Sequence, residues 1–331
     1  MNWNNTFVEL TNKANEGDLE AQTKLHDLYC DNRDEKQEFN QELVEFYKKG
    51  ANENKPYSLY YYSVMHFAGY GMDKDEDKAI ELLKKSMEYN CSEAYYMAAV
   101  THLAGVCHFS TYKDLLDQAM DMNNANAYIE SARDYDSQNN DKMAIKHYKK
   151  AIELGSKYAI YKLGEFYHDR EKYVLAKKYY KEAIKHEVHH AYFNLAVMYH
   201  LGEGYRVQRN DKWALELFHK AVELGNTRAM VNIAQYHEYN GNEDDAIKYY
   251  QMAIDEGKDP AAYRGLGKIY LKDKEIKKAI KLIVEGAREG DPECEMIARN
   301  FGILNLDWND EQIDRIAALC DTLKHFGAAD Y

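Results

Sequence analysis

The chain has 331 residues, 45% of them hydrophobic, and a formal net charge of −13. Because nucleic acids and anionic membranes are bound through basic surfaces, this charge disfavours both as partners and favours a basic protein surface. No apolar run approaches the length that spans a bilayer, so we expect no membrane-embedded segment.

A helix around Phe7, Val8 and Leu10 opens the chain, and we expect residues 1–16 to cap the fold at this end. From residue 17 onward one pattern recurs nine times, and each copy begins with a small residue that we call the anchor. A period of 32 to 38 residues predicts stacked supersecondary units, none of which buries its apolar face alone. The anchors are Ala21, Ser58, Ala94, Ala127, Ala159, Ala191, Ala229, Ala262 and Cys294.

The anchor opens the first helix of each repeat. After Ala159, a leucine, a glycine and a tyrosine follow at offsets of four, five and eight, and these offsets share one helical face. A large side chain at offset five would force a neighbouring helix away, so the small residues there predict a close second helix. They are Ser63, Ala99, Ala132, Gly164, Ala196, Ala234 and Gly267.

The second helix carries two small residues seven positions apart, such as Ala144 and Ala151, which form a flat patch over two turns. Four residues past the second member stands a residue that tolerates the left-handed conformation in which helices end. These stops are Asn54, Asn90, Asn123, Gly155, Gly225, Gly257 and Gly290, and only Glu187 breaks the rule. Each proline lies two residues before an anchor, where a first helix should begin: Pro56, Pro260 and Pro292.

The combined pattern resembles the SEL-type repeat family, a relative of the tetratricopeptide repeat, over residues 17–299. The resemblance rests on the opening A-x-x-x-L-G-x-x-Y, the closing K-A…K-A-x-E-x-G and the glycine turn of the longer copies at Gly69-Tyr70-Gly71. It implies an all-α fold, namely a right-handed superhelical solenoid of about eight helix-turn-helix repeats that binds proteins. It implies no substrate.

Residues 300–331 follow the last half-repeat and should form a C-terminal capping helix. Asn309-Asp310-Glu311 has the composition of a helix start, and apolar residues follow at three- and four-residue steps. They are Ile313, Ile316, Leu319, Leu323 and Phe326. Such a face would cover the exposed end of the last repeat, so we expect a cap at each end of the repeats.

One segment satisfies the metalloprotease motif H-E-x-x-H, from His186 to His190. It straddles the junction of two repeats, so its histidines should not share a helical face, and no third ligand is evident. We therefore expect no catalytic residues, no metal and no cofactor, with a zinc hydrolase as the alternative. His66, His102 and His237 take the offset-eight position of tyrosine and are expected to pack.

In the family that the pattern resembles, the first helix lines a concave groove, with offsets −1, +2, +6 and +9 facing it. These offsets hold aromatic and acidic residues in repeats two to six and basic ones, Arg264 and Lys268, in repeat eight. Rigid aromatic rings are frequent contact residues in interfaces, although packing between repeats is the alternative for any single tyrosine. The expected partner-binding residues are Tyr57, Tyr60, Phe67, Glu93, Tyr96, Tyr158, Tyr161, Glu165, His190, Phe193 and His200.

These features predict a non-enzymatic scaffold that binds a protein with a basic or apolar surface in its groove. A bacterial adaptor or a toxin-neutralising immunity protein would fit, and a secreted effector that engages host proteins is the alternative. The first residues lack the regions of a secretory signal, and five cysteines without a spacing motif favour reduced thiols. We therefore expect a cytoplasmic location, with leaderless export as the open alternative.

Overall fold

The computed structural model describes residues 3–18, 20–22, 24–25, 41–103, 105, 109–203, 209–300, 311–312 and 315. All regular elements in these ranges are helices, which confirms the predicted all-α class. None of the helices described is long and apolar enough to cross a membrane. The apolar residues of the expected C-terminal cap, Ile313 to Phe326, lie outside the described residues.

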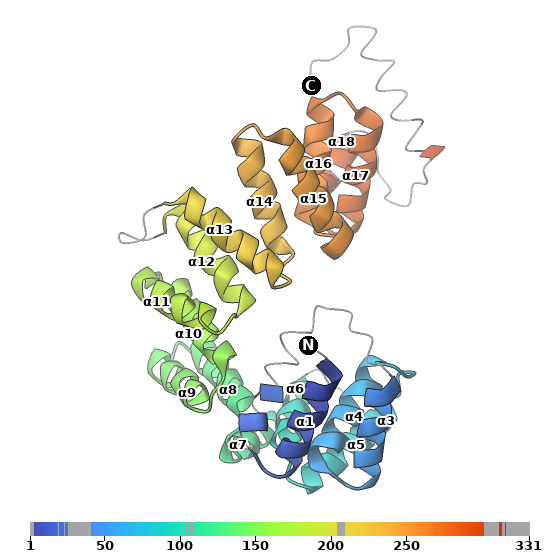
Figure 1. Cartoon of the computed structure of the whole chain (residues 1–331), viewed down its shortest axis with the longest axis vertical. Helices are drawn as coiled ribbons and strands as arrows, with labels where there is room; N and C mark the ends of the chain where they lie inside the picture. The colour runs from blue at the N-terminus through green and yellow to red at the C-terminus, as the bar shows by residue number, and fades with distance from the viewer. Residues whose placement is uncertain are drawn as a thin grey trace. The chain divides into compact units, whose positions relative to one another are not determined.

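The chain forms two compact units, Met1–Val188 and His189–Tyr331. The first unit contains α1 (Trp3–Asn15), α3 (Gln41–Asn52), α4 (Pro56–Ala68), α5 (Glu76–Glu88), α6 (Ser92–Leu103), α7 (Tyr112–Asp121), α8 (Ala125–Ser137), α9 (Asp141–Glu153), α10 (Lys157–Asp169) and α11 (Tyr173–Ile184). The second contains α12 (His189–Leu201), α13 (Asp211–Glu223), α14 (Arg228–Tyr239), α15 (Glu243–Gly257), α16 (Pro260–Lys272), α17 (Ile276–Arg288) and α18 (Pro292–Asn300). Figure 1 shows both units as successive helix pairs.

In repeats two to eight the first helix packs along the second helix of its own repeat, as α4 does on α5, α8 on α9 and α14 on α15. The small residue at offset five is where the two helices approach. At Gly164, an added Cβ would lie 2.7 Å from the ring of Tyr180, a residue that is 1% exposed. A larger residue would therefore separate α10 from α11, and the predicted close approach is confirmed.

Most of the predicted stops have the left-handed backbone that ends a helix. The φ angles are 57° to 60° at Asn54, Asn90 and Asn123, and 90° to 93° at Gly155, Gly225 and Gly290. The prediction for Gly257 is wrong: α15 continues through Gly257, and Lys258 takes the left-handed conformation with a φ of 47°. Glu187 adopts a φ of 59° although it is not glycine. The chain geometry therefore requires this conformation even where the residue disfavours it.

Replacing Glu187 with glycine is expected to raise the free energy of unfolding by about 0.5–1 kcal/mol, because glycine reaches a positive φ without a Cβ clash. Glu187 is exposed, so the change removes no buried contact. Urea denaturation followed by circular dichroism measures the effect. The reciprocal variant Gly155→Glu, at the same position of the preceding repeat, should lower stability by about 1–2 kcal/mol. Equal stability of Glu187→Gly and the unmodified protein would contradict the prediction.

The three prolines stand where the sequence predicts, each as the first residue of its helix. Asp259 and Asp291 accept backbone N–H groups of the first turns of α16 and α18, at 2.9 and 2.8 Å. Lys55 offers no such acceptor to α4, and Asn15 of α1 accepts the N–H of Tyr57 instead, at 2.9 Å. The N-terminal helix thus completes the N-cap of α4, the first helix of repeat two.

Candidate binding face

The first helices of neighbouring repeats contact one another. In the first unit α4 contacts α6 and α8 contacts α10, and in the second unit α14 contacts α16 (Figure 1). First helices of successive repeats thus lie side by side, and the predicted groove residues are those at offsets −1, +2, +6 and +9 on these helices. We call the surface of these first helices the first-helix face of each unit.

Four of the expected groove residues are buried within the first unit. Tyr57, Tyr60, Glu93 and Tyr161 are at most 4% exposed. The ring of Tyr60 packs against its neighbour Tyr61 at a centroid distance of 4.9 Å, edge to face. The packing alternative therefore describes these four residues, and they offer almost no surface to a partner.

The other expected groove residues are partly exposed. Val100, one turn after Tyr96 on α6, is 36% exposed and adds an apolar side chain to the face. In the second unit, the ring of Phe193 packs edge to face on Phe218 at 5.8 Å, and His200 Nδ1 lies 3.0 Å from Asp211 Oδ1. The partly exposed residues are Phe67, Tyr96, Tyr158 and Glu165 in the first unit and His190, Phe193 and His200 in the second.

Two carboxylates of α8 near Tyr112 lie outside the four offsets. Asp134 of α8 accepts a hydrogen bond from the Tyr112 hydroxyl at 2.8 Å, and Glu130 pairs with Arg133 at 2.9 Å. The pKa of Tyr112 is raised, mainly by burial and next by the hydrogen bond and the charge of Asp134. The charges of Glu130 and Tyr96 make smaller contributions. Glu130 and Tyr96 are thus near enough to the Tyr112 hydroxyl to influence its ionisation. We call Tyr96, Tyr112, Glu130 and Asp134 the acidic-aromatic patch.

On α10, a lysine and a carboxylate bind the aromatic rings of the same helix. Lys162 Nζ lies 2.7 Å from Glu165 and about 5 Å from the ring centroids of Tyr158 and Tyr161, at 5.1 and 5.2 Å. The Tyr161 hydroxyl donates to Glu165. Glu165 is thus held by two donors, while Tyr158 presents the outer, partly exposed ring of this group.

Glu93 lies in a buried polar cluster at the start of α6. Ser92 Oγ donates to its carboxylate at 2.8 Å, and Asn124 donates to Ser92 at 3.3 Å. Among the residues described, no cation lies within ion-pair distance of Glu93. Burial raises the pKa of this carboxyl, while hydrogen bonds from Tyr57 and Ser92 act in the opposite direction. Burial therefore makes ionisation of Glu93 costly, and the donated hydrogen bonds offset part of that cost.

Glu93→Gln is expected to raise the free energy of unfolding at pH 7 by about 1 kcal/mol, because it removes the cost of a buried charge. A raised folded-state pKa means that the folded chain holds the proton more tightly. Its stability therefore falls as the pH rises from the unfolded value, about 4.3, through the folded value. The gain should shrink towards zero at pH 4, where both states are protonated.

Urea titrations of both proteins at pH 4, 5.5 and 7 measure this difference, and the exposed Glu81→Gln serves as the control for removal of one charge. A gain for Glu93→Gln that is the same at all three pH values would contradict ionisation as its cause.

The basic groove positions of repeat eight are engaged within the chain. Arg264 Nη1 lies 2.6 Å from Asp291, which is 4% exposed, and Arg264 Nε lies 3.4 Å from Glu293. Lys268 also pairs with Glu293. These two cations therefore join α16 to α18, and little of their charge is open to a partner.

The structure separates the histidines of the H-E-x-x-H segment. Helix α11 ends at Ile184 and α12 begins at His189, with the left-handed Glu187 between them. The metalloprotease motif needs both histidines on one helix. His186 and His190 do not meet this requirement, because His186 precedes α12 and His190 lies within it. In the described ranges no cluster of three metal-ligating side chains occurs. The ring of His237, one of the expected packing histidines, stacks on Tyr249 at 5.8 Å.

Comparisons with known proteins agree with this architecture. The Sel1 repeat family model matches residues 56–88, 133–156, 157–187 and 189–226, and a tetratricopeptide repeat model matches residues 231–293. No curated protein matches the sequence.

Three solved structures share the fold. A Sel1 repeat protein from Oxalobacter formigenes has a TM-score of 0.54 at 15% identity, over 88% of this chain and 89% of that one. Yeast Tom70 has a TM-score of 0.55 at 20% identity, over 95% and 66%. A protective antigen of uropathogenic Escherichia coli with an SLR fold has a TM-score of 0.52 at 20% identity, over 88% of this chain. The match spans only 64% of the antigen's length.

Proposed function

Because this chain belongs to the Sel1-type and tetratricopeptide-like repeat solenoids, we propose that it is a non-enzymatic scaffold that binds a protein through its first-helix face. Proteins of this architecture generally bind protein partners. The observation that carries the proposal is the acidic-aromatic patch together with the 36% exposed Val100. It combines partly exposed rings, an apolar side chain and carboxylates on consecutive repeats.

The chemistry of this face selects the partner. Tyr96, Val100 and Tyr158 offer apolar area at little entropic cost, and Asp134 offers negative charge, whereas the charge of Glu130 is paired with Arg133. The partner surface should therefore be apolar at its centre and basic around it. The net charge of −13 would speed encounter with such a surface at low salt. As the specific role we propose a cytoplasmic adaptor or a toxin-neutralising immunity protein.

Affinity capture with the full chain, followed by calorimetry on the captured partner, tests the proposal. The variant Tyr96→Ala/Val100→Asp should lose about 30-fold in affinity, which corresponds to roughly 2 kcal/mol for a central interface residue. The matched control is Val174→Ala/Leu175→Asp, which changes exposed apolar side chains (54% and 37%) on the second helix α11.

Thermal melting of each variant separates loss of binding from loss of fold. Suppose that both variants keep their fold, that Tyr96→Ala/Val100→Asp binds the partner at unchanged affinity, and that the α11 variant loses affinity. The first-helix face is then not the binding surface.

A further inference from the structure

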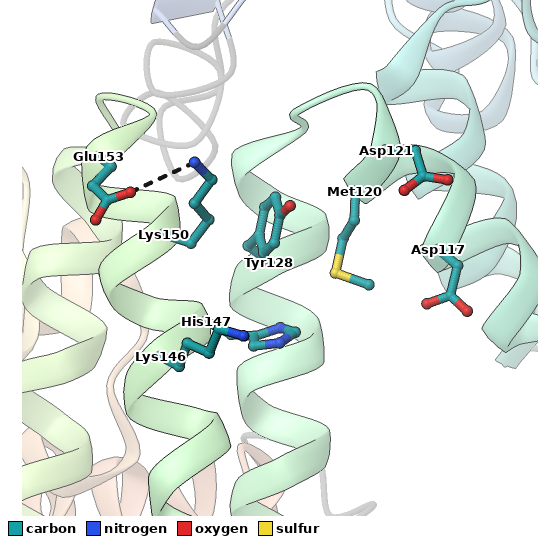
Figure 2. A pocket seen from close by; sticks show the side chains of 8 residues that line it. All are labelled: Asp117, Met120, Asp121, Tyr128, Lys146, His147, Lys150 and Glu153. Atoms are coloured by element: carbon teal, nitrogen blue, oxygen red, sulfur yellow. Dashed lines mark ion pairs between the residues drawn. The ribbon is translucent and has the colours of Figure 1, made fainter.

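A cavity of about 610 Å³ lies in the first unit on the side of the second helices. Its walls come from three helices: α7 contributes Asp117, Met120 and Asp121, α8 contributes Tyr128, and α9 contributes Lys146, His147, Lys150 and Glu153. Figure 2 shows the carboxylates of α7 on one side, the lysines of α9 on the other, and Tyr128 and Met120 between them. A cavity of this volume is in the range that accommodates a ligand.

The two charged walls do not neutralise each other. Asp117 and Asp121 are exposed, and among the described residues neither has a cation within ion-pair distance. Lys146 likewise has no acidic partner there, and Lys150 pairs only with its exposed helix neighbour Glu153 at 3.5 Å. Two like charges one turn apart on a helix repel each other mildly. The acidic wall therefore has no counter-charge among the described residues, while the basic wall has only the exposed Glu153 beside Lys150.

The floor between the walls is aromatic and uncharged. The ring of His147 packs edge to face on Tyr128 at 5.6 Å and on Tyr135 at 5.1 Å. Burial, assisted by the charge of Lys146 and opposed by that of Asp117, lowers the pKa of His147, which favours its neutral form. The floor therefore adds no third charge and keeps the acidic and basic walls apart.

We propose that this cavity binds an extended segment of a protein partner in which basic and acidic side chains alternate. Asp117 and Asp121, like Lys146 and Lys150, are four residues apart on a helix, a rise of about 6 Å. In an extended strand, residues two apart point to the same side and are separated by about 6.6–6.8 Å. Alternate basic side chains would therefore meet the two carboxylates of α7, and the intervening acidic ones would meet the lysines of α9.

This site is separate from the first-helix face, so its test does not depend on the proposed function. Fluorescence anisotropy would compare two labelled eight-residue peptides of equal composition on the full chain. One peptide alternates lysine and glutamate, and the other has four lysines followed by four glutamates. The alternating peptide should bind about tenfold more tightly, because the block sequence points half of its lysines at Lys146 and Lys150.

Variants assign the contacts. Asp117→Asn/Asp121→Asn and Lys146→Gln/Lys150→Gln should each weaken binding of the alternating peptide about tenfold. The fourfold charge exchange Asp117→Lys/Asp121→Lys/Lys146→Glu/Lys150→Glu should restore it, because the peptide can present its other side. The control Asp244→Asn/Glu256→Gln removes two exposed carboxylates from α15 and should have no effect.

Binding should also weaken as salt is added. Equal affinity for the two peptides, or unchanged binding by the neutralised walls, would overturn the proposal. Tyr96→Ala/Val100→Asp should leave peptide binding unchanged, so failure at either surface can be distinguished from failure at the other.

Discussion

Arg264→Ala is expected to lower the free energy of unfolding of the second unit by about 3 kcal/mol. Its guanidinium lies 2.6 Å from the carboxylate of Asp291, a residue that is only 4% exposed. Removing one member of a buried ion pair leaves the other charge without compensation, which costs roughly 3–5 kcal/mol. The lower end applies here because Asp291 also accepts the backbone N–H of Cys294 at 2.8 Å.

Lys268→Ala is the matched control, since Lys268 lies one turn further along α16 and pairs with the exposed Glu293. An exposed pair contributes up to about 1 kcal/mol. Urea denaturation would measure both variants, and melting should show a fall of about 10 °C for Arg264→Ala. Equal, small losses for the two variants would show that Asp291 needs no buried partner.

The repeat register could be predicted from sequence because it depends on local chemistry. A positive φ at Asn90 or Gly225 and a proline at the start of α16 are properties of one residue and its neighbours. The register also predicts where α10 and α11 approach each other closely. Gly164 stands at offset five, where the other copies also have small residues. Glu187 shows that the chain geometry overrides the preference of a single residue.

The surface could be predicted only in part, because exposure depends on which residue of a neighbouring helix lies opposite. Offsets place Tyr57 and Tyr161 on the first-helix face, yet neighbouring helices cover them. The same reasoning counted Arg264 as basic groove charge, whereas Asp291, the residue before α18, takes up that charge. The repeat pattern describes what the repeats have in common, whereas the contacts that bury a residue or pair its charge differ from one repeat to the next.

Glu130 and Asp134 escaped the offsets for a related reason. Asp134 is linked to the preceding repeat through Tyr112, the first residue of α7, and Glu130 lies one turn before it on α8. The cavity between α7 and α9 likewise joins residues of two repeats, from Asp117 to Glu153. Neither arrangement has a motif within a single repeat, so only the three-dimensional structure reveals them.

Phe166→Ala is expected to destabilise the first unit by about 3–5 kcal/mol, the usual cost of deleting a buried phenyl ring. Phe166 is 2% exposed and packs edge to face on Tyr148 at 5.9 Å. The guanidinium carbon of Arg170 lies 3.8 Å from its ring centroid, and Arg170 Nε donates to Asp141 at 2.8 Å. Arg170 also pairs with Asp136, so this ring supports a cation that joins α8, α9 and α10.

The control variants Phe166→Leu and Arg170→Ala separate the two contributions. Phe166→Leu keeps most of the apolar volume and should cost less than about 1.5 kcal/mol. If the ring holds Arg170 in place, the double variant Phe166→Ala/Arg170→Ala should cost less than the sum of the single variants, because one interaction is then lost only once. Additive losses would mean that Arg170 binds its carboxylates without help from the ring. A coupling would show that the ring of Phe166 supports the contacts that Arg170 makes from the end of α10 to Asp136 of α8 and Asp141 of α9, and so to the neighbouring repeat.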